Sequence, residues 1–100
     1  MARRYANANR RDANEPEVIR PIEDSRFGVL VQLHEGDGAD WMWLVAGSVI
    51  FLEIKNPAYA WHYTDDEMNM MAVCEATDVE YRTLETAEDT LKLLKEVRNE

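Results

Sequence analysis

The spacing of apolar residues along the chain predicts a mixture of strands and helices. Short apolar runs of strand length are found at residues 28–33, 40–46 and 49–55. Only Gly47 and Ser48 separate the second run from the third, so these two runs should form a hairpin. Residues 79–84 alternate apolar and polar side chains and predict a fourth strand.

Capping residues and helical spacing predict three helices. Asn14 precedes Glu15 and Pro16 and is expected to cap the first helix, which Pro21 should shorten or bend. Thr64 and Glu67 have the spacing of a capping box, which predicts a helix to about residue 76. Thr86 and Asp89 predict the start of the last helix in the same way. The apolar stripe expected on that helix consists of Ala87, Leu91, Leu94 and Val97.

The expected order is therefore helix, three strands, helix, strand, helix, which predicts a single α/β domain over residues 13–100. A central mixed sheet with helices packed on it buries these stripes. Residues 1–12 are rich in Arg, Asn and Ala and are expected to form a flexible basic arm.

The charge of the chain is unevenly distributed. The net charge is −9, but Arg3, Arg4, Arg10 and Arg11 precede a remainder, residues 12–100, that has seven basic and twenty acidic side chains. An acidic body argues against a general nucleic-acid binder, whereas the arm is suited to a phosphate backbone. The single cysteine, Cys74, lies among apolar residues and predicts a buried thiol in a reducing, cytoplasmic setting.

Residues that could form a functional site lie at the ends of the hairpin strands. Glu53 and Lys55 are two residues apart and so share one face of a strand. A turn at residues 46–47 places Asp40 opposite Glu53, and a turn at residues 47–48 places it opposite Lys55. Both turns put the three side chains on one face. From these three residues alone, a salt-bridge cluster at the sheet edge and a metal site both remain open.

Oxygen ligands from Asp40, Glu53 and the Ile54 carbonyl suit Mg²⁺ or Mn²⁺. Lys55 would then stabilise charge on a phosphate or orient the attacking water. The loop that follows contains Tyr59, Trp61 and Tyr63, which either stack on unpaired bases or cover the sheet or a partner interface.

The order of these motifs over residues 10–98 resembles the PD-(D/E)xK nuclease superfamily, in particular its small stand-alone VRR-NUC-like members from bacteria and phages. The matching segments are Arg10-Arg11-Asp12-Ala13-Asn14-Glu15, Gly38-Ala39-Asp40, Glu53-Ile54-Lys55 and Thr64-Asp65-Asp66-Glu67. The chain departs from the family in having Ala39 where a proline is usual and in lacking basic residues between positions 56 and 63.

The resemblance implies a restriction-endonuclease-like core and a metal-dependent DNA endonuclease that acts on branched DNA as a homodimer in a bacterial or phage-infected cell. It implies that Asp40 and Glu53 bind the metal and that Lys55 assists hydrolysis. An acidic residue of the first helix completes such sites, and by position this is Glu15, with Glu17 as the alternative. The acidic surface favours a different hypothesis, a catalytically inactive protein of the same fold that regulates a partner or mimics DNA.

Overall fold

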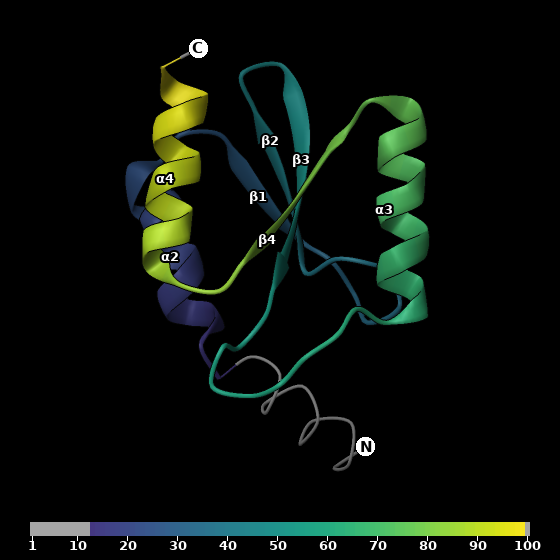
Figure 1. The fold of residues 1–100 in the computed structure, drawn as a ribbon. Coiled ribbons are helices and arrows are strands. Elements are labelled where there is room, and N and C mark those ends of the chain that lie inside the picture. Colours follow the sequence, from purple (N-terminus) through teal and green to yellow (C-terminus); the bar gives the residue numbers. More distant parts are fainter. Residues whose placement is uncertain (1–12, 100) are drawn as a thin grey trace.

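The computed structural model describes residues 13–99, which form helices and strands in the expected order (Figure 1). The helices are α2 (Glu15–Ser25), α3 (Asp65–Thr77) and α4 (Ala87–Arg98). The strands are β1 (Val29–Gln32), β2 (Trp41–Val45), β3 (Ser48–Ile54) and β4 (Glu80–Leu84). The predicted α/β class is confirmed, and the basic arm lies outside the described residues.

The strands form one mixed sheet in the order β1-β2-β3-β4. β1, β2 and β3 are antiparallel neighbours, and β4 is parallel to β3. Parallel neighbours need a crossover connection, and α3 lies within it. The predicted mixed sheet is therefore confirmed.

The β2–β3 hairpin turns at Ala46 and Gly47, because Val45 pairs with Ser48 and Trp41 pairs with Leu52. Both turn residues have positive φ, 53° and 76°, as tight hairpin turns between twisted strands require. Of the two turns that fitted the sequence, the one at residues 46–47 is correct and the one at residues 47–48 is wrong.

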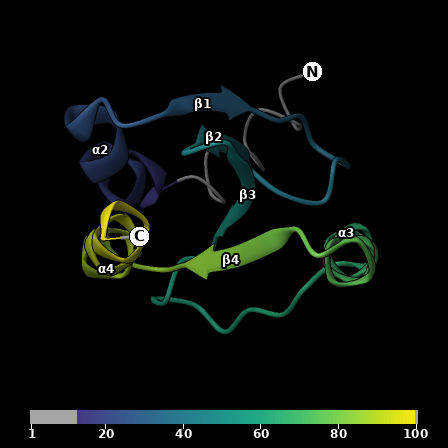
Figure 2. The same ribbon diagram turned by 90° about the horizontal axis from the view of Figure 1, so that it is seen from above.

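The apolar core lies between the sheet and the pair α2 and α4, while α3 lies on the opposite side of the sheet (Figure 2). Trp43 is completely buried there, and its indole N–H donates to the Phe27 carbonyl at 2.9 Å. Thr90 of α4 is also fully buried, and its hydroxyl donates to the Val18 carbonyl of α2 at 2.7 Å. This bond links the two helices inside the core.

Three sequence-based expectations need correction. Asn14 occupies the N-cap position without capping through its side chain, and its amide donates instead to the carbonyls of Lys55 and Glu85. The first helix is not cut short at Pro21, since it continues to Ser25, and the bend expected there stays a prediction. Leu91 is 53% exposed, because α4 turns its Thr90 and Leu93 side toward the core. Thr90 tolerates that position because its hydroxyl has an acceptor there.

Both predicted capping boxes are present, at Thr64 and Glu67 and at Thr86 and Asp89. Cys74 is buried, as its apolar neighbours predicted. Within residues 13–99, no helix has the length and apolar character needed to cross a bilayer.

Candidate functional site

The hairpin brings Asp40 and Glu53 together at the end of β3. Continuing the β2–β3 register by one residue places Asp40 opposite Glu53. An oxygen of Asp40 accepts the backbone N–H of Ile54 at 2.8 Å, which fixes the aspartate against the end of the strand. Both acids are buried, and Glu53 is only 1% exposed. Two carboxylates therefore face a low-dielectric environment at close range.

Lys55 is the cation of this group. Its ammonium Nζ lies 2.8 Å from a Glu67 oxygen and 3.5 Å from Glu53 Oε2. The same ammonium donates to the His62 carbonyl at 3.3 Å. The salt-bridge cluster that was the alternative to a metal site is thus present, but Lys55 is only 9% exposed, so the cluster is buried and does not lie on the surface.

Glu67 is the site residue that the sequence interpretation missed. The capping box predicted only its helix-starting role, and its Oε1 does accept the backbone N–H of Thr64 at 2.9 Å. The same oxygen accepts a hydrogen bond from Lys55. The available signal was the capping box itself, because its acidic side chain folds back toward the helix start, and this helix begins soon after Lys55.

Glu53 has the most strongly shifted pKa of the group. Burial, joined by the negative charges of Asp40 and Glu67, raises the pKa of Glu53 to about 9, and Lys55 offsets only part of this. Burial opposes the charge of Lys55, but its hydrogen bond to Glu67 and the two neighbouring carboxylates raise its pKa overall. The bonds that Glu67 accepts outweigh its own burial and lower its pKa. The site therefore holds more carboxyl groups than its single ammonium can neutralise.

A divalent cation would compensate this excess of carboxyl groups over positive charge. Among the described residues, the Oε2 atom of Glu53 is buried and has no hydrogen-bond partner. Asp40 and Glu53 offer hard oxygen atoms, and Mg²⁺ commonly takes one or two carboxylates and fills its other positions with water. However, no three His, Cys, Asp or Glu side chains of residues 13–99 are placed together as a ready metal-binding group. The fit rests on the Asp40 and Glu53 pair.

The other predicted ligands are held in ways that do not by themselves define a metal site. Glu15 is buried, and its carboxylate accepts the indole N–H of Trp41 at 2.7 Å. Glu17 is exposed on the same helix, which makes Glu15 the better placed of the two. Ile54 is buried, and its backbone N–H donates to Asp40, while the role expected for its carbonyl stays a prediction.

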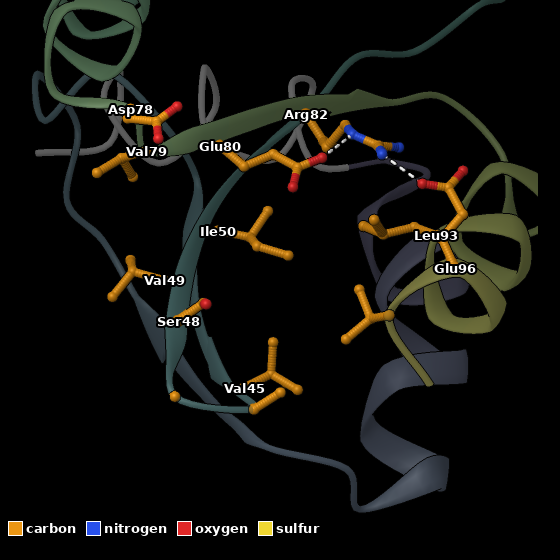
Figure 3. A pocket seen from close by; sticks show the side chains of 13 residues that line it. Val45, Ser48, Val49, Ile50, Asp78, Val79, Glu80, Arg82, Leu93 and Glu96 are labelled. Carbon is orange, nitrogen blue, oxygen red and sulfur yellow. Dashed lines mark hydrogen bonds and ion pairs between the residues drawn. The ribbon is translucent and has the colours of Figure 1, made fainter. Parts of the chain in front are cut away.

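A cavity of about 740 Å³ lies at the other end of the hairpin (Figure 3). Its wall includes the turn at Ala46 and Gly47 and an ion-pair bridge in which Arg82 contacts both Glu80 and Glu96. None of the candidate site residues lines this cavity. The carboxylate–lysine group is therefore separate from it.

No protein-family model, curated protein or solved structure matches this chain. The resemblance to PD-(D/E)xK nucleases rests on the motifs alone.

Proposed function

We propose that the protein is a Mg²⁺- or Mn²⁺-dependent endonuclease that hydrolyses phosphodiester bonds in DNA. The observation that carries this proposal is the buried Glu53 beside Asp40, because its Oε2 atom accepts no hydrogen bond and has the Lys55 ammonium as an ion-pair partner only at 3.5 Å. A buried acid whose charge is only partly compensated is costly for a fold, and such groups cluster where a ligand or chemistry requires them. A divalent cation would take the place of the proton on Glu53 and offset the repulsion that otherwise opposes ionisation of both acids.

Each residue of the site has a distinct proposed role. Asp40 and Glu53 hold the ion, with Glu15 extending its surroundings and the Ile54 carbonyl as a further oxygen. A bound ion of this kind polarises the phosphate and makes a water molecule more acidic. Lys55 donates to the attacking water or to a phosphate oxygen, and Glu67 is a positioning residue that fixes the Lys55 ammonium.

The arrangement of elements supports a restriction-endonuclease-like core. The candidate residues lie where the β2–β3 hairpin opens, next to the C-terminal ends of the parallel strands β3 and β4. Ligand sites of α/β sheets are commonly found outside the carboxyl ends of their strands. This placement is the fold-level support for a nuclease.

Action on branched DNA as a homodimer is part of the proposal. The homodimer is supported by the cross-strand pair Val29 and Leu44, two large apolar side chains exposed on β1 and β2. Leu44→Glu should shift sedimentation from dimer to monomer. Leu91→Glu, which adds the same charge at an exposed position of α4, should leave the dimer intact. A wild-type protein that sediments as a monomer at every concentration would refute this part.

A catalytically inactive regulatory or DNA-mimic protein is the second candidate. Residues 13–99 carry eighteen acidic and seven basic side chains. This negative balance is like that of a nucleic acid and unlike that of a protein that binds nucleic acids. In addition, Lys55 already faces three acceptors, from Glu67, Glu53 and the backbone of His62. Such a protein would occupy the basic groove of another protein and would not need a metal.

Calorimetric titration with Mn²⁺ separates the two candidates. The nuclease requires binding that is lost in Asp40→Asn and in Glu53→Gln but kept in Glu17→Gln, which removes an exposed acid from α2. It also requires cleavage of branched DNA that is lost in Lys55→Met although Mn²⁺ still binds. A wild-type protein that takes up no Mn²⁺ and cuts no form of DNA would favour the inactive protein.

A further inference from the structure

Two aromatic rings lie directly beside the lysine of the candidate site. Lys55 Nζ is 5.6 Å from the ring centroid of Trp61 and 5.7 Å from that of Tyr63. The two rings meet edge to face, with centroids 5.2 Å apart and planes at 73°. Trp61 is nevertheless 36% exposed, and Tyr59 of the same loop is 68% exposed. Solvent therefore reaches large aromatic side chains next to the proposed reaction centre.

These rings are held in place by polar contacts at and just beyond the end of β4. The indole N–H of Trp61 donates to a carboxylate oxygen of Glu85 at 2.9 Å. The hydroxyl of Tyr63 shares a hydrogen bond with the Thr83 hydroxyl at 2.7 Å. A ring fixed in this way loses little conformational freedom when a ligand stacks on it. The loop thus presents a preorganised aromatic surface.

Because residues 13–99 are acidic overall, the aromatic surface of the loop bears on how the protein could bind DNA. Binding to duplex DNA depends mainly on basic side chains that neutralise phosphates. Residues 13–99 carry a large excess of acid, and the site itself has Glu53 and Glu67 around one lysine, with Asp40 acting on Glu53. Stacking of a base on an aromatic ring needs no positive charge, because every base has a π-face.

We propose that Trp61 is a stacking platform for an unpaired base and that the substrate is therefore an exposed single strand, free or at a branch. This inference rests on the proposed nuclease function and deepens it. In a nucleotide, only one sugar separates the phosphate from its base. The centroid of the Trp61 ring lies 5.6 Å from the Lys55 ammonium, so the base of a phosphate held at Lys55 is within reach of the ring. Bases within a duplex are stacked on their neighbours and offer no free face, so the platform selects unpaired nucleotides.

The test measures binding without catalysis. A fluorescein-labelled oligothymidylate and a matched hairpin duplex are titrated with the full chain in the absence of divalent metal, and anisotropy is recorded. Stacking contributes about 1–3 kcal/mol per base, which corresponds to a loss of roughly 5- to 150-fold in single-strand affinity for Trp61→Leu. Trp61→Phe keeps a smaller ring and should fall between that variant and the wild type. Leu91→Ala, which truncates an exposed apolar residue of α4, should bind as the wild type does.

Several outcomes overturn the stacking platform. They are equal binding by Trp61→Leu and the wild type, stronger binding of the duplex than of the single strand, or no measurable single-strand binding by the wild type. Urea unfolding of each variant shows whether a loss of affinity is merely a loss of fold. The intermediate affinity expected for Trp61→Phe is a second check, because this variant keeps an aromatic ring at the position.

The nuclease proposal and the stacking platform can be refuted independently of each other. Trp61→Leu should bind Mn²⁺ with the wild-type affinity, because the ring is not part of the Asp40 and Glu53 pair. Normal Mn²⁺ binding and cleavage with no dependence on Trp61 would remove only the platform. Trp61-dependent single-strand binding by a protein that ignores Mn²⁺ would leave the platform and remove the nuclease.

Discussion

Replacing Glu53 by glutamine tests the electrostatics of the site directly. Glu53 is almost fully buried, and burial together with Asp40 and Glu67 raises its pKa from an ordinary 4.5 to about 9. Between these two values the folded protein keeps a proton that the unfolded chain releases. The metal-free protein should therefore lose stability as pH rises through this range. Glutamine has nearly the same shape but does not titrate.

The expected magnitude follows from one proton. A difference of one bound proton changes the free energy of unfolding by about 1.4 kcal/mol per pH unit. From about pH 5.5 to about pH 7.5, the wild type should thus lose about 2.7 kcal/mol relative to Glu53→Gln. That is a large part of the roughly 5–15 kcal/mol that stabilises a typical domain.

The assay is urea unfolding of both proteins with a chelator present, at several pH values across this interval. Comparing the two proteins largely removes the other titrating groups, which the proteins share. Adding Mn²⁺ should stabilise the wild type more strongly at the higher pH, because a metal binds the ionised carboxylate, and should have little effect on Glu53→Gln. Parallel pH profiles for the two proteins would show that Glu53 is ionised in the fold and would refute this reasoning.

Further predictions concern the lysine, the loop before Asp40 and the helix pair. Lys55→Met should lower the free energy of unfolding at neutral pH by about 3–5 kcal/mol, because it leaves the buried, ionised Glu67 without its cation; unchanged urea midpoints would contradict this. Gly38→Ala should cost more stability than Gly47→Ala, since both glycines have positive φ but only at Gly38 would a Cβ meet another residue, Met70 Cβ at 2.6 Å; equal thermal shifts would contradict the contact. Thr90→Val should cost about 1–3 kcal/mol by removing a buried hydrogen bond, whereas Thr90→Ser should keep most of it; if the two variants melt together, the hydroxyl does not stabilise the fold.

Much of the fold is encoded locally and was predicted for that reason. A capping box involves residues only three apart, so Thr64 and Glu67 identified the start of α3 without knowledge of the sheet. Side-chain alternation likewise placed Glu53 and Lys55 on one face of a strand. Two-residue turns were enough to predict that Asp40 would be near them, although two turns remained open.

The order of elements, the hairpin and the candidate residues Asp40, Glu53 and Lys55 could be read from the amino-acid order alone, because they depend on neighbours along the chain. Packing in three dimensions fixed the turn at residues 46–47 and brought Glu67 of α3 into contact with Lys55. It also decided that α4 buries Thr90 and exposes Leu91. These outcomes depend on contacts between distant segments and on the solvent that packing excludes. The same exclusion of water gives Glu53 its raised pKa, a property that no local pattern contains.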